Sequence, residues 1–302
     1  MGNRRMGVRR LEAVLDNLLD HTVLNGLNGS PFIIKNPDRY YVEEYFEYGI
    51  PQLNAVVLSS ADGNNAAQSI ASRTVELIGN AAASADITRS ATGAGITLTG
   101  DNDGDTINVT GHLDASLSAM GMTAWGSETE LQFETLVRTD ADIDELTIGA
   151  GWKLAANIAN VASWNFATDD NSCHFAYGAS DDDTGTLADN TALYFFSNHG
   201  AGNDVRVKLP IVVAANTSYR LGITIDSSRR VSAWVDGVQY GLAETTTAGE
   251  YKSGGANNTT KSAALTNDIN FVPAVGIVIE AGNSRLIHCA YIKCSRVAYD
   301  NS

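Results

Sequence analysis

The sequence predicts a mainly β protein built as an antiparallel sandwich or barrel, and two observations support this prediction. From residue 91 onward, short segments in which apolar and polar residues alternate recur about every 10–15 residues, with Gly, Asn and Asp between them. In addition, only 18% of the residues are charged, and small polar residues take their place. Alternation with a period of two is typical of half-buried strands and not of helices.

The clearest pair of strands lies in YRLGITIDSSRRVSAWVDG, residues 219–237. One face of the first strand carries Tyr219, Leu221, Ile223 and Ile225. The Asp236-Gly237 pair that follows the second strand has the composition of a tight hairpin turn. Each strand therefore has one face that we expect to pack against a second sheet. Further strands are expected at 95–100, 106–111, 130–139, 149–155, 192–198, 204–213, 270–282 and 285–299.

The first segment of the chain has helical character. Residues 8–20 place apolar side chains on one stripe, which includes Leu11, Leu15 and Leu18. The start of this helix is basic, with Arg4, Arg5, Arg9 and Arg10. Because a helix dipole favours acids at its N-terminus, local helix stability does not explain these arginines. Two interpretations stay open: a surface that binds a partner, or a solvated end of a helix packed on its own domain.

Residues 31–53 are rich in tyrosine and bounded by prolines. The tyrosines are Tyr40, Tyr41, Tyr45 and Tyr48. Aromatic side chains give a large contact area at low entropic cost. The segment is either an extended arm that docks on a neighbouring subunit or a flap folded on the main sheet. We therefore expect three parts: a helix and interaction arm at 1–53, a β-rich connector at 54–90, and a sandwich at 91–302.

Charge and hydropathy exclude several classes of protein. The chain carries a net charge of −15, although its first ten residues hold four arginines and no acid. An acidic body repels phosphate, so we expect no nucleic-acid partner. No segment approaches the roughly 18 apolar residues of a membrane helix, so we expect no membrane partner. No secretory leader is visible, and the protein is expected to be made in a cytoplasm.

The three cysteines predict neither a disulfide framework nor a zinc site, because their number is odd and no CxxC pair is present. We expect Cys173, Cys289 and Cys294 to be reduced packing residues. Cys289 and Cys294 are five positions apart in one expected strand. Strict alternation would place them on opposite faces of a sheet.

The hairpin at 219–237 resembles a late hairpin of laminin-G-like, or concanavalin A-like, jelly rolls. In that family a strand of the type W/Y-x-L-x-I-x-x-D runs into a strand that ends in V-D-G. The matching residues are Tyr219, Leu221, Ile223, Asp226, Val235, Asp236 and Gly237. The resemblance covers roughly residues 91–300 and implies a concanavalin A-like jelly-roll sandwich. It implies little about function, because lectins, glucanases and structural proteins share the scaffold.

The start MGNRRMGVRRLEAVLDNL is similar to the starts of virion structural proteins of tailed bacteriophages, notably those that infect marine bacteria. The succession GITLTG, GDTINVTGHLDA, ELQFETLVRT and VAANTSYRLGITIDSSRR also resembles such proteins. This resemblance implies a virion component located on the particle surface or associated with the capsid. No binding motif of that family is defined well enough to be carried over to single residues.

Two acidic clusters are candidates for chemistry. Glu128, Glu130 and Glu134 in ETELQFE resemble the E-x-D-x-x-x-E strand of jelly-roll glucanases, with Glu130 where Asp is expected. On a strand they would share one face, and a retaining glycosidase needs two carboxyls about 5–5.5 Å apart. The alternative is the solvent-facing polar side of a half-buried strand.

The second cluster is DNDGD, in which Asp101, Asp103 and Asp105 have the acid density of a calcium loop. It lacks the later ligands of the EF-hand pattern, so an acidic hairpin turn is the interpretation that we prefer. The five histidines lack metal-ligand spacing. We expect no cofactor, with calcium at this turn as the one candidate.

Together these observations predict a non-enzymatic virion structural protein, a capsid decoration or cement protein. The arm at 1–53 would bind the major capsid protein or other virion proteins and would hold a homo-oligomer, for which a trimer is the best guess. Two alternatives stay open. One is a carbohydrate-binding adsorption module on a head or tail appendage that binds a host glycan. The other is a glycan hydrolase that uses Glu128, Glu130 or Glu134.

Overall fold

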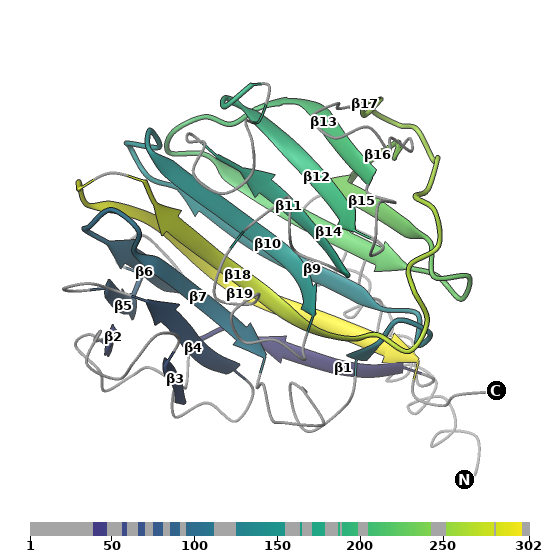
Figure 1. The fold of residues 1–302 in the computed structure, drawn as a ribbon, viewed down its shortest axis with the longest axis horizontal. Helices are drawn as coiled ribbons and strands as arrows, with labels where there is room; N and C mark the ends of the chain where they lie inside the picture. The colour runs from purple at the N-terminus through teal and green to yellow at the C-terminus, as the bar shows by residue number, and fades with distance from the viewer. Residues whose placement is uncertain are drawn as a thin grey trace, which may run out of the picture.

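The protein is a sandwich of two antiparallel β-sheets, seen face-on in Figure 1. The computed structural model describes residues 39–46, 56–58, 66–69, 75–80, 85–90, 95–111, 125–154, 164, 171–178, 187, 189–198, 205–242, 252–280 and 282–297. This part of the chain contains no helix, and thus none that is long and apolar enough to cross a membrane. The N-terminal helix expected at 8–20 lies outside the described residues.

The first sheet, sheet A, is centred on its longest strand, β19 (Arg285–Val297). Its order is β16 (Val238–Tyr240), β15 (Val231–Val235), β14 (Ser218–Ile225), β9 (Gln132–Thr139), β19, β6 (Ile96–Gly100), β5 (Ala85–Arg89) and β2 (Val56–Leu58). A further strand, β1 (Arg39–Glu44), pairs with the C-terminal half of β19, whereas β6 pairs with its N-terminal half.

The second sheet, sheet B, has β10 (Leu146–Leu154) and β18 (Asn270–Ile279) at its centre. Its order is β17 (Lys252–Ser253), β13 (Val205–Val212), β12 (Ala192–Asn198), β11 (Ser172–Tyr177), β10, β18, β7 (Thr106–Gly111), β4 (Val75–Asn80) and β3 (Ala66–Ser69). The short β8 (Trp125–Gly126) also pairs with β18. Of these pairs only β13–β17 is parallel, so the predicted antiparallel jelly-roll sandwich is confirmed.

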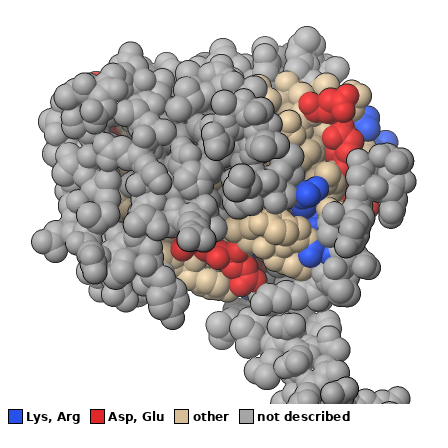
Figure 2. All heavy atoms as spheres, turned by 90° about the horizontal axis from the view of Figure 1, so that it is seen from below, with Lys and Arg blue, Asp and Glu red and all other residues tan. Residues whose placement is uncertain are grey.

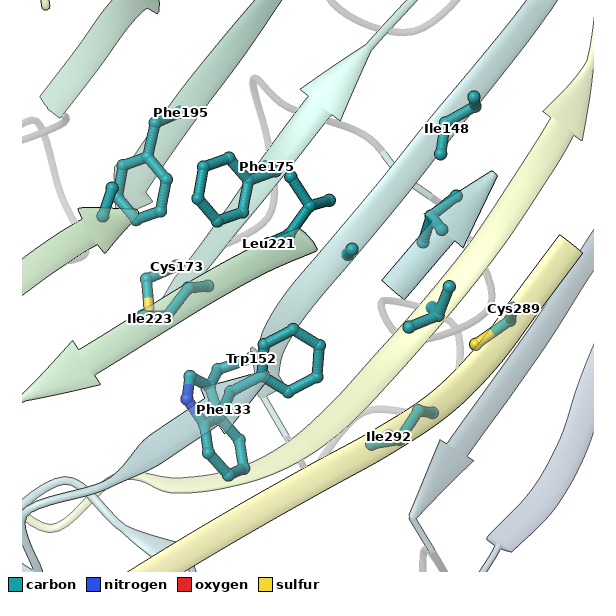
Figure 3. Packing of buried hydrophobic residues seen from close by; sticks show 14 of the residues in the cluster. Phe133, Ile148, Trp152, Cys173, Phe175, Phe195, Leu221, Ile223, Cys289 and Ile292 are labelled. Carbon is teal, nitrogen blue, oxygen red and sulfur yellow. The ribbon is translucent and has the colours of Figure 1, made fainter. Parts of the chain in front are cut away.

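The main hydrophobic core lies between the two sheets (Figure 3). Sheet A contributes the apolar positions of each alternating strand, such as Phe133 and Ile223, both fully buried. Sheet B contributes Trp152, whose ring centroid lies 5.9 Å from that of Phe133 and 5.6 Å from that of Trp125. The apolar positions of each alternating strand are therefore the ones that face the other sheet.

Over β11, β12 and β18, sheet B is also buried on its outer face, which explains why ALYFFSN in β12 is apolar without alternation. A second cluster lies there, and Trp164 is its largest side chain. A Cβ at Gly149 would stand 2.0 Å from the Trp164 indole, so only glycine leaves room for this ring. The indole Nε1 donates a hydrogen bond to Asn108 Oδ1 at 2.6 Å. Trp164 thereby contacts both β10, at Gly149, and β7, at Asn108, on the outer face of sheet B.

Strand β19 contains a β-bulge at Ala290 that changes which side chains face the core. Cys289 lies opposite Val137 of β9, but Tyr291 lies opposite the adjacent Leu136, so one residue of β19 is left without a partner there. The extra residue shifts the alternation by one position. From Tyr291 onward, each side chain of β19 therefore points to the opposite face of the sheet from the one that an uninterrupted strand would give it.

This bulge overturns the expectation for the cysteines. Cys289 and Cys294 are five positions apart, yet both are fully buried in the core between the sheets. An uninterrupted strand would point one of them outward. Burial raises the pKa of the Cys289 thiol to about 12, because the thiolate would be desolvated. All three cysteines are free thiols.

The described part of the N-terminal half belongs to the sandwich. β1, which carries Tyr40 and Tyr41 of the expected arm, pairs with β19 of the same chain. Of the two interpretations left open for residues 31–53, this is the arrangement of a flap on the main sheet. The expected connector also contributes strands to the sandwich, because β4 pairs with β7 and β5 pairs with β6.

We expect Gly95→Ala to destabilise the protein by about 1–3 kcal/mol or more, because Gly95 supports the bulge. Its φ is +96°, and an added Cβ would stand 2.1 Å from the carbonyl oxygen of Cys289. Gly282→Ala is the matched control, since nothing lies within 4 Å of its Cβ position. Urea denaturation measures both variants, and equal midpoints would contradict this account of the bulge.

Candidate surface site on sheet A

Six directly opposed residues form a row across the outer face of sheet A. In strand order they are Glu43, Lys293, Glu134, Gly222, Trp234 and Gln239. Each alternates along its strand with residues of the core, so the row faces away from sheet B. Adjacent strands are about 4.8 Å apart, and five such spacings give the row a length of about 24 Å. We call this set the cross-strand row.

Aromatic side chains stand at both ends of the cross-strand row. Trp234 is partly exposed near one end, whereas the other three tryptophans are at most 1% exposed. Near the other end, the ring of Tyr45, which is 36% exposed, meets the ring of Tyr291 with their centroids 5.9 Å apart. Lys293 Nζ lies 4.5 Å from the Tyr291 ring centroid and 5.1 Å from that of Tyr45. This ammonium group therefore makes cation–π contacts with both tyrosines.

Between these aromatic ends lies a buried carboxylate. Glu134 is only 5% exposed, and the hydroxyl of Tyr291 donates a hydrogen bond to its Oε1 at 2.8 Å. Burial and the adjacent Glu134 carboxylate raise the pKa of Tyr291 well above its usual range. Tyr291 therefore keeps its proton and acts as a hydrogen-bond donor at neutral pH.

The structure separates the three glutamates of ETELQFE. Strand β9 begins only at Gln132, and Glu130 has a left-handed φ of 51°, so the expected alternation does not hold there. Glu128 accepts a hydrogen bond from the backbone N–H of Asp268, and Glu130 forms an ion pair with Arg39 at 3.7 Å. The prediction of one shared carboxylate face is therefore wrong. Glu134 is also not the solvent-facing residue of the alternative interpretation.

The acidic turn before β7 satisfies its own carboxylate. Asp105 is fully buried, and its Oδ2 accepts hydrogen bonds from the backbone N–H groups of Asp101 and Asn102 at 3.2 and 3.0 Å. These bonds close the turn from within. Within the described ranges, no group of three or more His, Cys, Asp or Glu side chains is placed to hold a metal ion.

The residues expected to bind partners fall into two groups. Arg4, Arg5, Arg9, Arg10, Leu11, Leu15, Leu18 and Tyr48 lie outside the described residues. Tyr40 points toward the core side of β1, and its ring centroid lies 6.1 Å from that of Trp125. Tyr41 lies on the outer face opposite Ser295, and Tyr45 belongs to the aromatic end described above.

Sequence reasoning missed Tyr291, Lys293 and Trp234 as members of one site. The strands that carry them were expected, but the pairing of β19 with β1 and β9 was not. The bulge at Ala290 adds a second difficulty, because strict alternation would put Tyr291 and Lys293 on the core side with Cys289. The alternation of VSAWVDG does place Trp234 opposite to Val231, Ala233 and Val235, and that signal was available.

Comparison with known proteins gives structural likeness only. No family model matches the chain, and no curated protein matches it. The endo-β-1,3(4)-glucanase SCLam of family GH16 is similar with 10% identity and a TM-score of 0.45, over 89% of this chain and 95% of that chain. The alginate lyase A1-II′ of polysaccharide lyase family 7 is similar with 11% identity and a TM-score of 0.44, over 70% and 84%.

A carbohydrate recognition domain, that of Emp46p in its metal-free form, is similar with 9% identity and a TM-score of 0.42. The similarity covers 73% of this chain and 87% of that domain. Likenesses at this level concern the general two-sheet architecture. They carry no information about the ligand or activity of this chain.

We expect Tyr291→Phe to lower the free energy of unfolding by about 1–3 kcal/mol, because Glu134 stays buried without its hydroxyl donor. Tyr45→Phe is the matched control. Its hydroxyl lies 3.4 Å from Glu43 at an exposed position, so its loss should change stability by less than about 0.5 kcal/mol. Chemical denaturation of both variants checks this, and equal losses would contradict the buried role of Glu134.

Proposed function

We propose that the protein is a carbohydrate-binding β-sandwich whose ligand lies along the cross-strand row. The observation that carries this proposal is the placement of partly exposed aromatic rings at both ends of a row of hydrogen-bonding side chains. Aromatic faces pack against the apolar C–H face of a sugar ring, and polar side chains bond its hydroxyl groups. Trp234 and Tyr45 supply the rings, and Glu43 and Gln239 supply hydrogen-bonding groups.

Binding without chemistry agrees best with the state of the glutamates. A glycosidase needs a pair of carboxyls that flank the scissile bond. Here Glu128, Glu130 and Glu134 have three different partners, namely the backbone of Asp268, Arg39 and Tyr291. We therefore propose a binding module and not a hydrolase.

A role on a bacteriophage particle extends this proposal. One role open from the sequence is that of an adsorption module on a head or tail appendage, which binds a polysaccharide of the host. In that case the cross-strand row, which includes Glu43 of β1, binds the glycan, and the residues that precede β1 hold the protein on the particle or in a homo-oligomer. The support for this extension is the resemblance of the N-terminal sequence to virion proteins.

We expect Trp234→Ala to weaken binding to soluble polysaccharides by about tenfold, because the sugar ring loses its packing against the indole. The comparable stacking of a nucleic-acid base on an aromatic side chain is worth about 1–3 kcal/mol, and 1.4 kcal/mol corresponds to about tenfold. Affinity electrophoresis against a soluble β-glucan, a galactomannan, a xylan and a polyuronate measures the effect. Val212→Ala is the control, since Val212 is an exposed apolar residue of sheet B, 69% exposed. The proposal is refuted if the native chain binds none of the polysaccharides of the panel.

A further inference from the structure

The acids and bases around the cross-strand row neutralise one another. Lys293 stands directly between Glu43 and Glu134, one on each neighbouring strand. Strand β14 carries Arg220, whose charge lowers the pKa of Tyr291, whereas the adjacent Glu134 raises it, so this guanidinium and the Glu134 carboxylate act on the same phenol with opposite sign. Each of these two cations therefore has an acid as its neighbour, and an anionic ligand would have to compete with that acid.

The same pattern holds at the borders of the row. Arg39 forms an ion pair with Glu130 at 3.7 Å. Further along β9, Arg138 and Asp140 act with opposite sign on the pKa of His288. On the face of the molecule that Figure 2 shows, both Lys and Arg atoms and Asp and Glu atoms of the described residues are present. The described residues around the row thus offer a carboxylated or sulfated glycan no excess of positive charge, and the net charge of −15 on the chain adds long-range repulsion.

The two aromatic ends are too far apart for one sugar ring. Trp234 lies on β15 and Tyr291 on β19, and β14 and β9 separate them. Three strand spacings give a separation of about 14 Å or more. A single sugar ring is about as wide as the aromatic ring against which it packs. A ligand that uses both ends must therefore be a chain that crosses the strands. Gly222 stands in the row beside Trp234 and adds no side chain, as is common where a ligand approaches a strand.

We propose that the cross-strand row takes an uncharged glycan chain that contacts Trp234 and the Tyr45–Tyr291 pair at the same time. This inference rests on the proposed carbohydrate-binding function and specifies its ligand. Charge balance selects against uronate and sulfated polymers, and the spacing of the aromatic ends selects for a chain over a mono- or disaccharide. Linking two weak contacts through one ligand raises affinity without any new contact.

Isothermal titration of the full chain with ladders of neutral gluco-, manno- and xylo-oligosaccharides, from the disaccharide upward, tests the inference. A length-matched oligouronate ladder and a sulfated oligosaccharide serve as charged probes. We expect the Kd for at least one neutral ladder to fall by at least about tenfold with length and then to level off. The charged probes should bind at least about tenfold more weakly at low salt, where repulsion is least screened.

Trp234→Ala and Tyr45→Ala should each abolish the dependence on length, and Val212→Ala should preserve it. Tight binding of the oligouronate, full affinity at the disaccharide, or no binding by any neutral ladder would overturn the inference. The proposed carbohydrate-binding function fails separately if Trp234→Ala and Tyr45→Ala both leave the binding of every probe unchanged.

Discussion

The outer face of sheet A depends on one extra residue in strand β19. The bulge at Ala290 shifts the alternation of the strand, so that Tyr291 and Lys293 face outward while Ile292 and Cys294 enter the core. Without it, an ammonium group and a phenol would point into the space between the sheets, at a cost of several kcal/mol. The bulge fits against Gly95, which has the backbone conformation and the lack of a side chain that the contact requires. Bulges of this kind commonly re-aim side chains beside functional sites.

The local part of the fold could be predicted from the sequence, because alternation is a local signal. The segments around Leu221 and Val235 became strands β14 and β15 with the expected faces inward. The pairing of distant strands could not be predicted in this way. Tyr45 and Tyr291 are 246 positions apart in a chain of 302 residues, and only the pairing of β1 with β19 brings them together. The ETELQFE motif misled for a related reason, since the left-handed φ of Glu130 interrupts the strand that the pattern assumed.

The two faces of the sandwich serve different purposes. The outer face of sheet B carries, over β11, β12 and β18, a second apolar core in which Trp164 and Tyr194 are buried. The outer face of sheet A carries partly exposed aromatic rings, buried charges and balanced acids and bases. Apolar burial on one side stabilises the sheets, and stable sheets hold the cross-strand row at fixed spacings. A row of side chains held at fixed spacings is suited to a linear ligand, because little ordering entropy remains to be lost on binding.

The four tryptophans allow a direct test of where the ligand binds. Trp125, Trp152 and Trp164 are at most 1% exposed, whereas Trp234 lies on the cross-strand row and is partly exposed. Nitrogen-15 labelling gives one indole N–H signal for each, and Trp234→Phe assigns the signal of Trp234. During titration with a binding neutral oligosaccharide, the account predicts a progressive shift of the Trp234 signal with the other three unchanged. A saturating ligand that leaves the Trp234 signal in place would contradict it.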